Sequence, residues 1–196
     1  MIPESPPISI KLRMKLSVTF SKQFAMHANE KIKSAFVRVA AALTLKPAFG
    51  LGTGVSKTTI KDGLTCEIRE GNWTMTADMP EQVGGNAAGP TPGVYGRAAL
   101  GSCLAIGYMM RAATMNIPIK NIQVEVQSDY DDGALFGTTQ DAPPGYLEVR
   151  YTVTIDSNAP KEKILEMLDE ADLHSPYLDV FRRAQSCRRE VNLITT

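Results

Sequence analysis

The chain has 196 residues, which is enough for one domain with an added segment and a substantial core. Its 21 Lys and Arg residues balance 21 Asp and Glu residues, and this argues against binding to nucleic acid or to a membrane. Three widely spaced cysteines and two histidines indicate neither a disulfide framework nor a metal site, so we expect no cofactor. Residues 1–20 lack the apolar core of a signal peptide, and we expect a cytoplasmic protein with reduced thiols.

Residues 1–50 are expected to form an N-terminal extension that contains a strand and a helix. Apolar and polar residues alternate from Ile8 to Phe20, which is the period of a half-buried strand. Apolar residues then recur at helical spacing, at Ile32, Phe36, Val39 and Leu43. A Gly-rich link over residues 50–56 should join this extension to a main domain over residues 51–196.

The main domain should begin with a β-meander. Its expected strands are Thr58–Ile60, Leu64–Arg69 and Trp73–Asp78. Turn signals at Asp62-Gly63 and Gly71-Asn72 separate the three.

The stretch from Gly89 to Met115 is expected to be the central helix of the fold. Pro92 suits its first turn. Between Arg97 and Arg111 every face is apolar or small, which predicts a helix that is buried on all sides. Cys103 lies in the middle of it.

The second half of the domain should alternate strands and helices. The expected elements are strands at Ile122–Val126 and Leu147–Ile155, helices after Pro160 and Pro176, and a closing strand at Arg189–Thr195. A polar loop over residues 128–145 should separate the two strands. The whole order indicates an α+β fold in which helices cover antiparallel sheet.

Four short motifs carry a family resemblance. They are Met79-Pro80-Glu81-Gln82-Val83-Gly84-Gly85, Gly89-Pro90-Thr91-Pro92, Ala98-Ala99-Leu100-Gly101-Ser102-Cys103-Leu104 and Ser175-Pro176-Tyr177. Together they resemble the OsmC/Ohr family of osmotically induced and organic hydroperoxide resistance proteins, over residues 54–196. The resemblance implies an OsmC-like fold, in which antiparallel sheets wrap around long buried central helices in an intertwined homodimer with its sites at the subunit interface.

The resemblance also implies a chemistry and its residues. The family's better-known members reduce organic hydroperoxides with a peroxidatic Cys, an activating Arg and Glu, and a resolving Cys. The peroxidatic position matches Cys103, and the Arg position matches Lys61. This chain departs from the pattern at the other two positions, where it has Gly93 for the Glu and Ser175 for the resolving Cys. Glu81 is then a candidate to supply the missing carboxylate.

Two functions therefore stay open. One is thiol-dependent reduction of a small-molecule hydroperoxide by Cys103, with an external thiol as reductant. The other is a non-catalytic relative that binds an apolar small molecule and has lost the peroxidase chemistry. Cys103 favours the first function, whereas Gly93 and Ser175 favour the second. A hydrolase that uses His174 with Ser175 is a third, weaker interpretation.

Three further residues have more than one interpretation. Cys187 precedes two arginines and is either a second reactive thiol or an exposed spectator. Cys66 is expected to pack in a strand. Arg97, one turn into the central helix, should either pair with Glu81 or Asp78, because a buried guanidinium needs a partner, or bind an anion.

Overall fold

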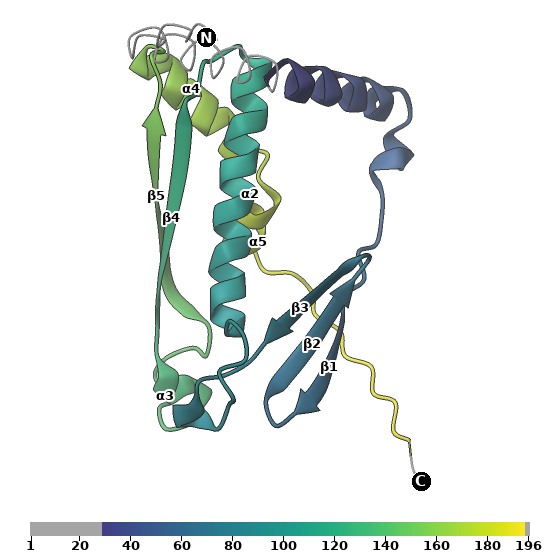
Figure 1. Cartoon of the computed structure of the whole chain (residues 1–196), viewed down its shortest axis with the longest axis vertical. Helices are drawn as coiled ribbons and strands as arrows, with labels where there is room; N and C mark the ends of the chain where they lie inside the picture. The colour runs from purple at the N-terminus through teal and green to yellow at the C-terminus, as the bar shows by residue number, and fades with distance from the viewer. Residues whose placement is uncertain (1–28, 195–196) are drawn as a thin grey trace, which may run out of the picture.

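The computed structural model of the chain describes residues 29–194. The strand expected over Ile8–Phe20 lies outside this range. The elements are a helix over 29–45, η1 (Pro47–Gly50), β1 (Lys57–Asp62), β2 (Thr65–Glu70), β3 (Trp73–Ala77), η2 (Glu81–Val83), α2 (Pro92–Thr114), β4 (Asn121–Tyr130), α3 (Asp132–Leu135), β5 (Tyr146–Asp156), α4 (Lys161–Asp172) and α5 (Pro176–Arg182). Figure 1 shows α2 standing between the β4–β5 hairpin on one side and the β1–β3 sheet on the other. The α+β prediction is confirmed.

One side of α2 forms the core. Leu100, Leu104, Tyr108 and Ala112, spaced by four residues, are at most 1% exposed, because side chains at this spacing share one helix face. They pack with α4 and α5, and with the inward side chains of the antiparallel β4–β5 pair. A Cβ atom built on Gly101 would lie 3.3 Å from a methyl group of Val126, so the helix approaches β4 closely at its small residues.

The other side of α2 is uncovered. Val94, Ala98, Ser102, Ile106 and Met110 are also spaced by four residues, and all five are exposed. Ile106 is 61% exposed. The expectation of a helix covered on every side is thus met on only one side within a single chain.

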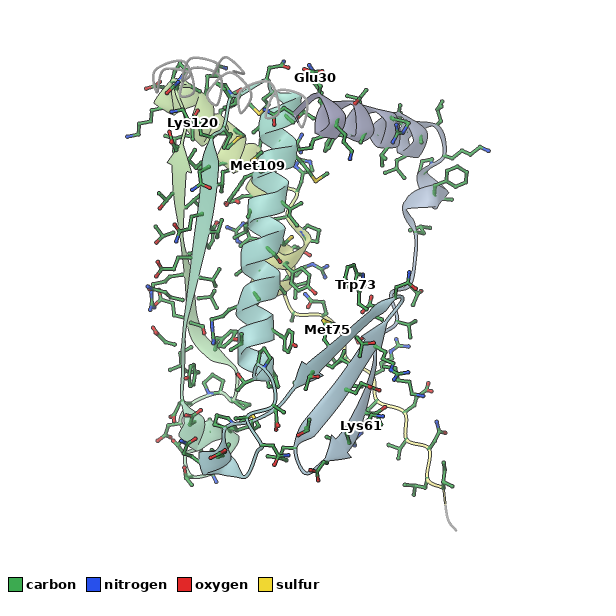
Figure 2. All side chains as sticks on the ribbon, viewed as in Figure 1. Glu30, Lys61, Trp73, Met75, Met109 and Lys120 are labelled. Atoms are coloured by element: carbon green, nitrogen blue, oxygen red, sulfur yellow. The ribbon has the colours of Figure 1, made fainter. Side chains whose placement is uncertain are left out.

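The β1–β3 sheet has one apolar face and one polar face. The strands pair in the order β1-β2-β3, which aligns Ile60, Cys66 and Ala77 across one face. Trp73 and Met75 follow on that face, on the side of the sheet toward α2 (Figure 2). Trp73 is 75% exposed and Ile60 is 59% exposed. This apolar face is therefore left without a cover by the described part of the chain.

The helix over 29–45 meets the end of α2. The Lys33 ammonium donates to the Asn116 side chain at 2.6 Å, and the Arg111 guanidinium lies over the Phe36 ring, 5.4 Å from its centre. Ile32 is half-buried as well, but Val39 and Leu43, further along the expected packing face, are 54% and 37% exposed. The helix is thus anchored at its first turns only.

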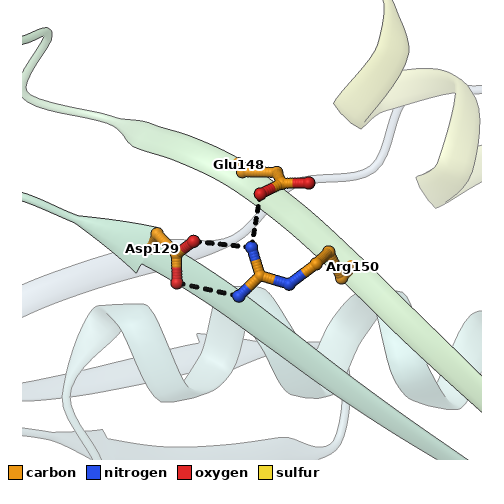
Figure 3. A network of polar contacts seen from close by, with 3 residues as sticks. All are labelled: Asp129, Glu148 and Arg150. Atoms are coloured by element: carbon orange, nitrogen blue, oxygen red, sulfur yellow. Dashed lines mark hydrogen bonds and ion pairs between the residues drawn. The ribbon is translucent and has the colours of Figure 1, made fainter.

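The outer face of the β4–β5 hairpin is polar. Arg150 on β5 donates to both carboxylate oxygens of Asp129 on β4, at 2.9 Å for one of them, and also to Glu148 (Figure 3). The Arg150 hydrogen bonds hold the pKa of Asp129 below its usual value. The alternation of this charged face with the valines facing α2 is that of a half-buried antiparallel pair.

Two expectations for the second half are corrected. The polar loop expected over 128–145 contains structure, because β4 continues to Tyr130 and the short helix α3 follows. The Asp131 carboxylate caps α3 by accepting from the Gly133 amide at 2.7 Å. The closing strand expected at Arg189–Thr195 is wrong for its described part, since none of residues 183–194 is in a strand. A strand needs a hydrogen-bonded neighbour, and the described residues provide none there.

Candidate functional site around Cys103

The segment that leads into α2 is fixed by a buried carboxylate. Asp78 is 2% exposed and accepts from the Thr65 hydroxyl at 2.8 Å and from three backbone amides. Burial alone would raise the pKa of Asp78, but these hydrogen bonds outweigh it and hold the pKa below the usual value. The ionised carboxylate thus ties the loop after β3 to the start of β2.

Two glycines of the same loop are sterically required. A Cβ on Gly85 would lie 1.9 Å from the Met79 carbonyl oxygen, and one on Gly89 would lie 2.6 Å from the Thr76 carbonyl oxygen. Neither backbone oxygen can yield without moving the chain. Gly85 and Gly89 are therefore required by the backbone geometry of the loop between β3 and α2, independently of any role in catalysis.

The first turns of α2 are tied to strands on both sides. The Tyr95 hydroxyl donates to the Thr76 carbonyl at 2.6 Å, and the Tyr146 hydroxyl donates to the Gly93 carbonyl at 3.0 Å. Gly93, where the resemblance implies a Glu, brings no side chain into this region.

Arg97 does not make the pair expected from the sequence. Its guanidinium donates to the Ser128 hydroxyl on β4 at 3.2 Å. Asp78 is saturated by its own loop, and no hydrogen bond or ion pair within residues 29–194 joins Glu81 to Arg97. The expected ion pair with Glu81 or Asp78 is wrong, because β4 rather than the preceding loop lies beside this turn of α2.

The Cys103 sulfur lies beside the Ser175 hydroxyl. Cys103 is half-buried on α2, and its Sγ is 3.6 Å from Ser175 Oγ. Ser175 is 8% exposed, and its Oγ accepts from the Leu178 amide at 3.4 Å as the N-cap of α5. With that lone pair engaged, the hydroxyl hydrogen is available to the sulfur. The structure thus brings together the two residues that the resemblance assigns to the peroxidatic and resolving positions.

A triad of buried Tyr108 and half-buried Tyr151 and Asp172, which the sequence analysis missed, holds α4 next to this pair. Tyr108 and Tyr151 each donate to a different Asp172 oxygen, both at 2.7 Å. Burial, followed by the bond to Asp172, raises the pKa of Tyr151 to about 12 and raises that of Tyr108 further. The Asp172 carbonyl also accepts from the Ser175 amide at 3.3 Å. The sequence contained a clue to this triad, because a tyrosine hydroxyl that is buried needs a hydrogen-bond partner.

Lys61 and Glu81 are not brought to Cys103 within one chain. Lys61, on β1, lies 3.3 Å from the Glu67 carboxylate on the neighbouring strand, in the sheet that stands apart from α2 (Figure 2). Glu81 is exposed in η2. No hydrogen bond or ion pair over residues 29–194 connects either one to Cys103. Their catalytic roles stay predictions.

The alternative candidates lie elsewhere. Cys187 is exposed and Cys66 is half-buried on β2, and the cysteines are free thiols. His174 points its Nδ1 at the Glu170 carbonyl, 2.9 Å away, rather than at Ser175. That arrangement does not support a His174–Ser175 hydrolase.

An open groove next to the pair has a volume of about 590 Å³. Its floor includes Leu100, one turn before Cys103, and its walls come from β5 and α5. The rings of Tyr146 and Phe181 stack there with centres 6.1 Å apart. Glu148 and Arg182 are its charged residues. The groove was not anticipated from the sequence, because it arises from packing β5 against α5.

The described residues contain neither a cluster of metal-binding side chains nor a membrane-spanning helix. Between residues 29 and 194, no three His, Cys, Asp or Glu side chains gather closely enough to hold a metal ion. Within the same range, no helix has both the length and the apolar character to span a bilayer.

Comparison with protein families gives a match to the model described as OsmC-like protein, over residues 84–188. This is more than half of the chain. The matched range includes α2, Cys103 and Ser175. None of the curated proteins compared with the chain matches it in sequence.

Solved structures with a similar fold include three bacterial proteins. The OsmC like protein from Mycoplasma pneumoniae has a TM-score of 0.58 at 16% identity, over 67% of this chain and 88% of that one. A putative osmotic stress induced and detoxification response protein from Psychrobacter arcticus 273-4 has a TM-score of 0.53 at 20% identity, over 66% and 89%. An organic hydroperoxide resistance protein from Elizabethkingia anophelis has a TM-score of 0.53 at 17% identity, over 67% and 89%. At these identities the likeness shows the fold alone.

Proposed function

Because the chain belongs to the OsmC-like protein family, we propose that it is an oxidative-stress protein that reduces organic hydroperoxides through Cys103 and uses an external thiol as reductant. The observation that carries this proposal is the contact between Cys103 Sγ and Ser175 Oγ at 3.6 Å. A hydroxyl at this place can donate to a thiolate, which favours the reactive form of the sulfur. Unlike a second cysteine, it cannot form a disulfide.

The reaction proceeds in two stages. The Cys103 thiolate attacks one peroxide oxygen, the O–O bond breaks, and the alkoxide takes a proton and leaves as the alcohol. The sulfur is thereby oxidised to a sulfenic acid. One external thiol then attacks this sulfur, which forms a mixed disulfide and releases water. A second external thiol restores the Cys103 thiol and leaves as the oxidised disulfide.

A homodimer is part of the proposal, and two uncovered surfaces of the described residues support it. The stripe of exposed α2 residues from Val94 to Met110 and the uncovered face of the β1–β3 sheet are apolar. In the proposed dimer, the sheet of one copy covers α2 of the other. The division into an extension, residues 1–50, and an OsmC-like domain, residues 51–196, belongs to the same proposal.

This arrangement also offers a source for the activating cation. Lys61 lies on β1 at the register shift between Ile60 and Asp62, and its ammonium contacts Glu67 on the polar face of the sheet at 3.3 Å. A site formed by Lys61 of one copy and Cys103 of the other, with Glu81 as the candidate carboxylate, therefore requires the Lys61 side chain to leave Glu67 and turn to the apolar face. A nearby ammonium lowers a thiol's pKa and stabilises charge as the O–O bond breaks.

Hydroperoxide consumption with purified full-length protein tests the proposal. With cumene hydroperoxide and dithiothreitol, we expect turnover that is abolished in Cys103→Ser and retained in Cys66→Ser and Cys187→Ser. Intact-mass analysis after peroxide alone should show added oxygens on Cys103 and no disulfide with Cys187. An unmodified Cys103 beside a readily oxidised Cys187 would overturn the proposal.

The second candidate function is non-catalytic binding of an apolar small molecule. It is favoured by the lack of a carboxylate at Gly93 and by the 3.3 Å contact that engages Lys61 with Glu67. In that case cumene alcohol, which has no peroxide bond to break, should bind as well as cumene hydroperoxide. Cys103→Ser should leave both affinities unchanged within twofold.

A further inference from the structure

A second groove lies at the far end of α2 from its N-terminal turns, between α2 and α4. Its volume is about 760 Å³. Its apolar residues are Met115, Leu165 and Leu173, of which Leu165 and Leu173 are 47% and 77% exposed. An exposed apolar floor of this kind marks a docking surface.

Acidic side chains line this groove. Its lining includes Glu162, Glu166, Asp169 and Glu170, against the single cation Arg111. Two of the four carboxylates have ion partners, since Glu166 lies 2.7 Å from Lys163 and Glu170 lies 3.6 Å from Arg111. Among the described residues, Glu162 and Asp169 have no such partner. The groove therefore suits a segment that is both apolar and basic.

The chain itself contains such a segment, N-terminal to the helix over 29–45. No Asp or Glu occurs between Glu4 and Glu30. In the alternating stretch Ile8–Phe20, the even positions are apolar and the odd positions include Lys11, Arg13 and Lys15. In an extended conformation this stretch would present one apolar face and one basic face.

The position of the first described residues puts the groove within reach of this segment. Lys33 contacts Asn116, and Phe36 lies under Arg111, which itself lines the groove. Glu30, at the start of the helix, lies beside the end of α2 in Figure 2. From residue 29 back to Lys15 the chain spans up to about 46 Å when extended, so reach does not limit docking.

The length of the groove along α4 matches the length of the basic part of this segment. From Glu162 to Leu173 the helix runs about 16 Å at 1.5 Å per residue, which a strand covers with about five residues. The five residues Lys11–Lys15 hold all three cations of the alternating stretch. The groove at Leu100 has one acidic and one basic lining residue, Glu148 and Arg182, and offers no such charge match.

We propose that the segment Ile8–Phe20 docks in the acidic groove between α2 and α4 of its own chain. Leu12 and Met14 face the apolar floor, and the long cationic side chains reach the carboxylates along its rim. The helix over 29–45 contacts α2 only through its first turns, and the docked segment would fix it to the domain at a second place. The inference does not depend on the proposed peroxidase function.

Carbodiimide cross-linking of full-length protein tests the docking, because it joins Lys amines directly to carboxylates in contact. The sample is refolded from equal amounts of light and ¹⁵N-labelled chain. We expect peptides that link Lys11 or Lys15 to Glu162, Glu166 or Asp169, in all-light and all-heavy pairs only. Mixed pairs would place the segment on a second copy, and links from these lysines only to other carboxylates, or none at all, would equally overturn the proposal.

Hydrogen exchange of the same full-length protein gives an independent readout. Amides of residues 8–20 should exchange at least tenfold faster in Glu162→Lys/Asp169→Lys than in the wild type. The matched control Glu125→Lys/Glu148→Lys makes the same charge change on β4 and β5 and should leave that exchange unaltered. Equal exchange in the wild type and the groove variant would contradict the docking.

Discussion

The two halves of this molecule differ in how far one chain can complete them. The half built from α2, the β4–β5 hairpin, α4 and α5 buries its own apolar side chains, and Leu100, Leu104 and Met167 are at most 1% exposed. The β1–β3 sheet has the same amphipathic pattern but buries only Ala77. Its most apolar residues, Ile60 and Trp73, are more than half exposed.

The difference shows that the apolar–polar pattern of a strand does not determine whether its apolar face is covered within one chain. Alternation along a strand says which face is to be covered, but not which chain supplies the cover. The α2, β4–β5, α4 and α5 half finds its cover locally, because α2, β4 and β5 follow one another along the chain and pack together. The sheet's cover is absent from residues 29–194, and in the proposed dimer another copy supplies it.

The largest expected effect lies in the completed half. Leu104→Ala leaves a cavity in the core that α2 forms with β4, α4 and α5 and should lower the free energy of unfolding by about 2–5 kcal/mol. Urea denaturation monitored by circular dichroism measures it. The control Leu45→Ala removes a side chain that is 83% exposed and should change that free energy by less than about 0.5 kcal/mol. Equal losses would mean that Leu45 is covered in solution.

The uncovered sheet should show its effect in association. Trp73, the only tryptophan, should emit at a blue-shifted wavelength at micromolar concentration and shift to the red on dilution, because the dimer covers its ring. Trp73→Ala should weaken dimerisation by about 2 kcal/mol in sedimentation equilibrium. Thr74→Ala, on the polar face of β3, should not. A monomer with red-shifted emission at every concentration would contradict the proposal that a second copy covers the sheet.

The Tyr108–Asp172–Tyr151 triad gives a smaller effect with a pH signature. Tyr108→Phe leaves one Asp172 oxygen without its donor and should cost about 1–2 kcal/mol. Because the folded pKa of Tyr151 is raised to about 12 from about 10 in the unfolded chain, its contribution is complete below pH 10 and is lost between pH 10 and 12. Denaturation midpoints against pH should fall over that range, and less steeply in Tyr151→Phe.

The smallest effect is expected at Arg150. Its contacts with Asp129 and Glu148 are at the surface of the hairpin, where water and salt screen ion pairs. Arg150→Ala should leave the denaturation midpoint within experimental error of the wild type at 150 mM salt. A clear loss at that salt concentration would show that the outer hairpin face is covered.

The sequence was a good guide wherever a local pattern decides the structure. The meander, the helix opened by Pro92 and the two helices opened by Pro160 and Pro176 follow from turn residues and periodicity. The reach of β4 to Tyr130 was missed because Ser128 and Asp129 suggest a loop. They form strand because their partners on β5, Val149 and Glu148, hold them in register.

Only part of the candidate site could be predicted from local sequence patterns. The position of Ser175 opposite Cys103, 72 residues away in sequence, came from the family resemblance and not from any spacing rule. Arg97 was paired with the wrong segment, since a sequence does not show that β4 passes beside the first turns of α2. The Asp172 triad and the groove at Leu100 depend on tertiary packing alone.

The uncovered sheet also has a consequence for the order of biosynthesis. The β1–β3 segment leaves the ribosome before α2 and carries an apolar face that no later part of the described chain covers. In the proposed dimer, each newly made chain therefore exposes this apolar face until it meets a second copy. Neighbouring ribosomes on one messenger would shorten that interval, and a holdase chaperone present in the meantime would bind this sheet first.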